Sequence, residues 1–176
     1  MSKSIYLLIL TLLLTTQSFA QSIEQKTDSI LQLIENETVD TAKVLLLYKL
    51  AGLYSGHDPE KNLELLHQTL SFSKKIKFDR LTTSTYLKIS KLHRILASPS
   101  DSLLLYVQLL EKHAQSTGNF KYIIKAHANY GLYYKYLGQY DKSIASYIKA
   151  LELSRKHNEP KEEQAVFISN IWQTLQ

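Results

Sequence analysis

The chain has 176 residues, no cysteine and a formal net charge of +5 at pH 7. The lack of cysteine excludes disulfides, thiol nucleophiles, cysteine metal sites and the lipid-modified cysteine of a bacterial lipoprotein, so a folded domain must be held by its core alone. The mild charge excess, with no polybasic run and no basic helix face with interleaved aromatic residues, argues against nucleic acid as a partner.

Residues 1–20 have the features of a secretory signal. Lys3 is the only charged residue among them, residues 5–14 are almost wholly apolar, and Ser18 and Ala20 place small side chains at the two sites that a signal peptidase reads. An apolar core of roughly ten residues is too short to span a bilayer. We therefore expect cleavage before Gln21, no membrane span in the processed chain, and export to the periplasm or beyond, as in Gram-negative bacteria. An uncleaved anchoring segment is the alternative.

The clearest structural pattern lies in residues 120–160 and predicts two amphipathic helices joined by a tight turn. On the first helix, residues recur at intervals of three or four and form one stripe, made of Ile123, His127, Tyr130, Tyr134 and Leu137. The apolar stripe of the second helix is made of Ile144, Tyr147, Ile148 and Leu151. Gly138 ends the first helix, and Asp141 lies where a helix N-terminus favours an acceptor. Pro160 prevents the second helix from continuing.

Fainter copies of this unit lie on both sides of it. A shift of 41 positions places Tyr147 on Tyr106 and predicts a unit at residues 80–119, with Pro99-Ser100-Asp101 in place of the turn. A further shift of 39 predicts a unit at residues 41–79.

The ends of this array are predicted by the same pattern. In the first unit, Asp58 caps a helix that starts at Pro59. Beyond the third unit, a partial unit is expected at residues 161–176, and residues 21–40 form a leading helix that caps the open end.

The third unit resembles a tetratricopeptide repeat. The family's pattern of small and aromatic residues is matched by Gly131, Tyr134, Tyr140, Tyr147 and Ala150. The resemblance extends over residues 41–176 and implies an all-α fold, an α-solenoid in which antiparallel helix pairs stack as a right-handed superhelix. Ser143 departs from the family's usual alanine but is small enough to pack there.

Trp172 departs further, because it occupies the place that Gly131, Ser90 and Ala51 hold in the other units. Small residues are needed there since the two helices of a pair cross closely, and a buried tryptophan would overpack by about 1–3 kcal/mol. Either the last helix has no partner, or the authentic chain differs beyond this point.

A narrower resemblance rests on the leading signal, the Asp40-Thr41-Ala42-Lys43 opening and the Asp58-Pro59-Glu60-Lys61 segment. This arrangement is similar to the extracytoplasmic sensor regions of bacterial histidine kinases and transcription regulators that carry these repeats. In that group a membrane helix and an output domain follow the repeats. Neither occurs in this sequence, which we therefore expect to be a truncated or remnant copy.

The resemblance implies a groove for a protein or peptide, lined by the first helix of each unit. The candidate groove residues are Tyr48, Lys49, Leu87, Lys88, Lys91, Arg94, Lys125, Ala128, Asn129, Leu132, Lys135, Tyr136 and Asn170. Cationic side chains beside aromatic rings suit an extended peptide with acidic groups or a free carboxylate. Ordinary solvated lysines on helices are the simpler interpretation.

No catalytic, cofactor or metal site is predicted. No pair among the six histidines has the spacing of a zinc site, and His93 and His127 are expected to be packing residues. Glu162 and Glu163 are explained by the dipole of the last helix. We therefore predict a non-catalytic scaffold without cofactor. The second hypothesis is a self-associating module, a homodimer formed through Ile168, Ile171, Trp172 and Leu175.

Overall fold

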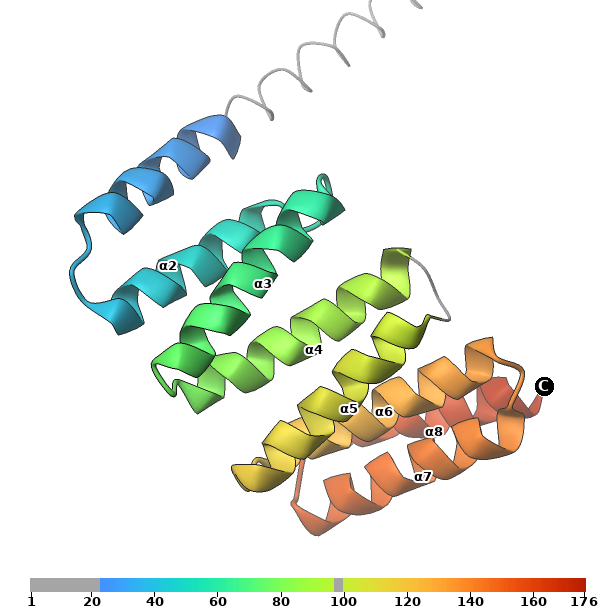
Figure 1. Ribbon diagram of the computed structural model, residues 1–176. Helices are drawn as coiled ribbons and strands as arrows, with labels where there is room; N and C mark the ends of the chain where they lie inside the picture. The colour runs from blue at the N-terminus through green and yellow to red at the C-terminus, as the bar shows by residue number, and fades with distance from the viewer. Residues whose placement is uncertain (1–22, 97–99) are drawn as a thin grey trace, which may run out of the picture. The chain divides into compact units, whose positions relative to one another are not determined.

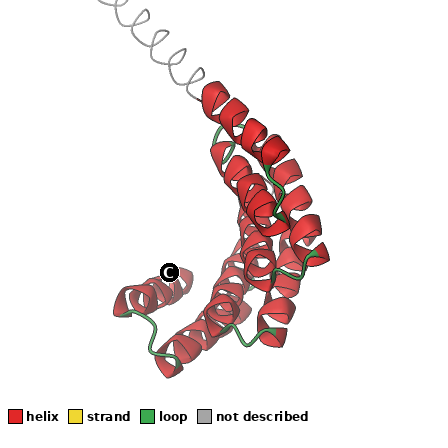
Figure 2. Cartoon of the chain, turned by 90° about the vertical axis from the view of Figure 1, so that its left-hand side faces the viewer, coloured by secondary structure: helices red, strands yellow, loops and turns green. Residues whose placement is uncertain are grey.

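The structure is a computed structural model that describes residues 23–96 and 100–176. The predicted signal at residues 1–20 and Pro99 of the predicted turn lie outside the described residues. Over the described ranges the chain forms α-helices and no strand (Figure 2), which confirms the predicted all-α class. None of the helices in this part of the chain is both long and apolar enough to cross a membrane.

Eight helical segments follow one another along these two ranges (Figure 1). Residues 23–36 form the first. The others are α2 (Asp40–Leu53), α3 (Pro59–Lys75), α4 (Asp79–Leu96), α5 (Asp101–Ser116), α6 (Phe120–Tyr136), α7 (Tyr140–Lys156) and α8 (Lys161–Leu175). The described residues divide into two compact units, an N-terminal one up to residue 65 and a C-terminal one from residue 66, and the boundary falls within α3.

The N-terminal unit has a small apolar core made by side chains of successive helices. Ile30, Val44, Leu50, Ala51 and Leu65 are all buried. The predicted start of α3 is confirmed, because the Lys61 backbone N–H donates to Asp58 Oδ1 at 2.9 Å and Pro59 is the first helical residue. A side-chain acceptor before a proline at the first helical position is a common way to begin a helix.

In the C-terminal unit, each of the helices α4 to α8 packs on the next, and α4 also packs on α6 (Figure 1). The first helices of successive pairs, α4, α6 and α8, begin at residues 79, 120 and 161, which are 41 positions apart. This order of contacts is that of a solenoid of helix pairs, and it confirms the predicted architecture.

The second helices of the pairs follow a period of 40 rather than 41. The buried residues of α5 are Leu103, Val107, Leu110 and Ala114, and those of α7 are Ser143, Tyr147, Ala150 and Ser154. The predicted equivalence of Tyr147 with Tyr106 is therefore wrong by one residue, and Val107 takes that place. Helix α5 begins 22 residues after the start of α4, whereas α7 begins 20 residues after the start of α6, so the second helix is reached later in the earlier pair.

Helices α6 and α7 come closest at Gly131. A Cβ atom added to Gly131 would lie 2.7–2.8 Å from ring atoms of Tyr147, which is wholly buried. Ser143 Oγ donates to the Gly131 carbonyl at 2.8 Å, so the serine both fits this crossing and ties the two helices together. Leu137 and Ile148 were predicted to lie on the apolar sides of these helices, and this prediction is wrong because both are exposed. Leu137 is the C-cap of α6, beyond its last helical residue.

We expect Gly131→Leu to lower the free energy of unfolding by about 1–3 kcal/mol, because the added side chain must displace the Tyr147 ring. Chemical denaturation of the purified protein measures this change. Ala145→Leu adds a similar volume at an exposed position of α7 and serves as the control, expected to stay within about 0.5 kcal/mol. Equal stability of Gly131→Leu and the wild-type protein would contradict a close crossing.

Candidate functional site

Three lysines of the first helices form a basic face, which we define as Lys88 and Lys91 on α4 and Lys125 on α6. Burial lowers the pKa of Lys125 below its ordinary value, and its neighbours Lys121 and Lys91 lower it further. Glu163 and Glu159 act in the opposite direction and raise it. Lys91 and Lys125 therefore lie within electrostatic reach of each other although they are 34 positions apart in the sequence.

Two lysines of the basic face, Lys88 and Lys125, are half-buried, whereas Lys91 is exposed. Burial is also the main cause that lowers the pKa of Lys88, and Lys91 adds to it. The Lys125 ammonium lies 5.6 Å from the centre of the Tyr122 ring, within the range of a cation–π contact. Desolvation disfavours a charged ammonium. A negative group placed beside these lysines would therefore stabilise their charged form more strongly than it would on an open surface.

Two predicted groove residues are largely covered. Leu87 keeps 8% of its surface exposed and Asn129 keeps 6%. The Asn129 side-chain amide donates to the backbone carbonyl of Lys125 at 2.7 Å, one turn earlier on the same helix. The amide nitrogen is thus engaged within α6.

The remaining predicted residues differ in exposure and in location. Arg94, Ala128, Leu132, Lys135 and Asn170 are half-buried, and Tyr136 is exposed. Lys135 Nζ donates to the Gln173 carbonyl at 3.3 Å, which links α6 to α8. The structure brings the residues of α4, α6 and α8 into one unit, whereas Tyr48 and Lys49 belong to the other unit.

A polar network between α5 and α6 was not found from the sequence. Tyr130 Oη donates to Glu111 Oε2 at 2.9 Å, and His127 Nε2 lies 3.5 Å from Glu111 Oε1. Burial, together with the hydrogen bond to Glu111, raises the pKa of Tyr130 far above its ordinary value. The network holds a carboxylate between two consecutive helix pairs and has no local sequence signature, because Glu111 is 16 and 19 positions from its partners.

A second cluster joins histidine and tyrosine rings of α3, α4 and α5. His93 stacks on Tyr106 with ring centres 5.4 Å apart, and Tyr106 Oη lies 3.4 Å from His67 Nδ1. Tyr86 contacts the rings of both Tyr106 and His113. Among the residues that the structure describes, no group of three or more His, Cys, Asp or Glu side chains could hold a metal ion.

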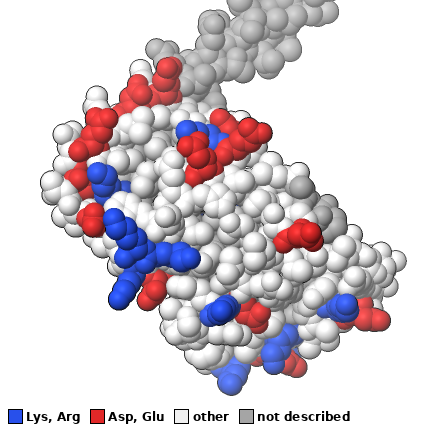
Figure 3. Space-filling view, viewed as in Figure 1, with Lys and Arg blue, Asp and Glu red and all other residues white. Residues whose placement is uncertain are grey.

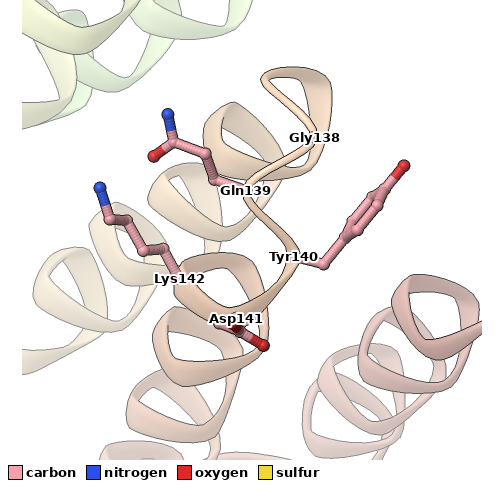
Figure 4. A pocket seen from close by; sticks show the side chains of 5 residues that line it. All are labelled: Gly138, Gln139, Tyr140, Asp141 and Lys142. Carbon is pink, nitrogen blue, oxygen red and sulfur yellow. The ribbon is translucent and has the colours of Figure 1, made fainter.

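A shallow hollow of about 370 Å³ lies at the turn between α6 and α7 and is lined by Gly138, Gln139, Tyr140, Asp141 and Lys142. Tyr140 points to the opposite side of the turn from Gln139 and Lys142 (Figure 4). Lys142 Nζ lies 5.5 Å from the centre of the Tyr134 ring. The lining comes from a single turn, so we place the candidate site at the basic face instead.

Charges on the molecular surface are of both signs. On the face shown in Figure 3, basic and acidic side chains are interspersed among uncharged ones. The electrostatic environment of each charged residue is therefore set mainly by its near neighbours. For Lys125 these neighbours include Glu163 and Glu159.

A sequence model of the tetratricopeptide repeat matches residues 124–157. The match spans most of α6 and all of α7, and it places one repeat of this kind on the pair that crosses at Gly131. No curated protein matches the chain at a significant level.

We expect the stability of the protein to fall as the pH drops below about 6.5, in part through His127. The pKa of His127 lies below 6.5 because burial lowers it more than the neighbouring Glu111 raises it. Lys149 lowers this pKa further. The unfolded chain then binds a proton more tightly than the folded one, so the stability from neutral His127 is present above pH 6.5 and is lost as the pH falls through the folded pKa.

Denaturation curves measured between pH 7.5 and 5 test this expectation, with a loss of at most about 1.4 kcal/mol per pH unit for one proton. His127→Gln should flatten the curve of stability against pH. His57→Gln, at an exposed position of the turn after α2, is the matched control. An unchanged slope in His127→Gln would contradict the expectation.

Proposed function

We propose that the protein is a non-catalytic binding scaffold that holds a segment of a partner protein against the basic face of α4 and α6. Tetratricopeptide repeats generally mediate protein–protein interaction, and the matched repeat includes Lys125. The partner in this proposal is a protein or peptide, not a nucleic acid, a metal ion or a cofactor.

The observation that carries the proposal is the approach of Lys91 and Lys125 on two neighbouring first helices. The Lys125 ammonium is partly desolvated and is repelled by the exposed Lys91, so a carboxylate placed between the two ammonium groups would be attracted to both. The preferred segment is therefore extended and acidic, through Asp and Glu side chains or a chain-terminal carboxylate.

We also propose that the chain is exported and that it acts as the sensor portion of a signal-transduction protein. The apolar stretch of residues 5–14, followed by the small residues Ser18 and Ala20, supports export. Mass spectrometry of the protein recovered from the periplasm or the medium is expected to find Gln21 as the first residue. A chain that keeps Met1 after export would contradict cleavage.

The test of the binding role reverses two charges of the basic face. We expect Lys91→Glu with Lys125→Glu to weaken binding of a fluorescently labelled hexaglutamate peptide at least tenfold, as measured by fluorescence anisotropy at fixed ionic strength. The reason is that two attractive contacts become repulsive ones in a partly desolvated site.

A matched variant separates this local effect from the change in net charge. Lys74→Glu with Lys75→Glu alters the net charge equally at exposed positions at the end of α3, and it should leave the affinity within about threefold. Equal weakening by the two double variants would contradict a site at the basic face.

Self-association is the second candidate function, and one observation favours it. Ile168, Trp172 and Leu175 on α8 expose 40%, 64% and 64% of their surfaces. Large apolar side chains gathered on one helix mark a contact surface more often than isolated ones do.

A further inference from the structure

We infer that α8 docks antiparallel on α8 of a second copy of this chain, through an α8 stripe made of Ile168, Trp172 and Leu175. The inference deepens the second candidate function and rests on it. These residues are spaced four and three positions apart, so they lie on one side of the helix.

Helix α8 is seated on the array in the same register as the first helices before it. Phe167 and Thr174 are buried, and so are their counterparts 41 positions earlier, Ala126 and Tyr133 on α6. The α8 stripe consequently corresponds to His127, Gly131 and Tyr134 of α6.

In both preceding pairs, the second helix of the pair covers this side of the first. On α6, Gly131 meets the Tyr147 ring of α7, and Tyr134 meets Lys142.

On α4 the counterparts are Tyr86, Ser90 and His93. The rings of Tyr86 and His93 lie 6.4 and 5.4 Å from the ring of Tyr106 on α5. The same side of α8, by contrast, is open over most of its apolar surface.

Trp172 makes this side unsuited to a second helix placed like α7. At the equivalent Gly131, even a single added Cβ would lie 2.7 Å from the facing tyrosine ring. An indole at that position keeps a covering helix further away, or displaces its contacts. The occupant of the α8 stripe is therefore a surface shaped for a protruding aromatic side chain.

A second copy fits this surface because residues 164–176 carry no charged side chain. In a twofold contact every group near the axis approaches its own copy, so a charge there would repel itself. The stripe is also close to symmetric about Trp172, with Ile168 four residues before it and Leu175 three residues after it. Antiparallel pairing thus places Trp172 near Trp172 of the second copy, and Ile168 near Leu175.

The experiment uses Trp172 as its own probe, since it is the only tryptophan of the chain. Sedimentation equilibrium of the full chain is expected to show a monomer–dimer equilibrium. Over the same concentration range the fluorescence emission should shift to shorter wavelength as the indole becomes buried. Ile168→Glu should weaken dimerisation at least tenfold, because it would bury a carboxylate against the apolar Leu175 of the second copy.

Two further variants complete the design. Trp172→Gln should also weaken dimerisation at least tenfold, whereas Leu105→Gln removes an exposed apolar side chain from α5 and should leave it unchanged. Circular dichroism checks that each variant keeps its helix content.

The outcomes distinguish the inference from the function on which it rests. A monomer at every concentration would overturn both self-association and the inference. A dimer that neither α8 substitution weakens, or in which the emission of Trp172 does not move, would overturn the inference alone and leave self-association standing.

Discussion

The close approach of α6 and α7 at Gly131 is the constraint on which the C-terminal unit depends. With no side chain at that position, the buried Tyr147 ring can lie directly against the α6 backbone, and Ser143 Oγ bonds the Gly131 carbonyl. The pair then offers one apolar side to α8, where Phe167 joins Ile124, Ala150 and Leu151. Stability in such an array comes from contacts between neighbours, so this crossing affects every pair that packs on it.

The two candidate surfaces are consequences of the same packing. Because α4 packs on α6, lysines from two different pairs come within electrostatic reach on the first-helix side. Helix α8 repeats the seating of α6 but carries Trp172 where α6 has Gly131. At this position glycine lets α7 approach α6 closely, whereas on α8 the tryptophan side chain is exposed.

Much of the fold could be predicted from the sequence because its signals are local. Asp58 with Pro59 marks a helix start, and Gly138 adopts the left-handed conformation, φ +69°, that ends α6. The register of α5 was predicted wrongly by one residue. The match of Tyr147 with Tyr106, both tyrosines, favoured a period of 41 and hid the later start of α5 in its pair. The covering of Leu87 and Asn129 could not be foreseen, because the seating of neighbouring pairs determines it. The network around Glu111 joins residues of different helix pairs, so no regular spacing in the sequence indicates it.

The most direct test of the Gly131 crossing is a double-mutant cycle between Gly131→Ala and Tyr147→Leu, with free energies of unfolding measured by chemical denaturation. The account predicts that Gly131→Ala destabilises the protein by about 1 kcal/mol or more when Tyr147 is present, and far less when leucine replaces it, because the added methyl group then meets no ring. Additive effects of the two substitutions would contradict the account.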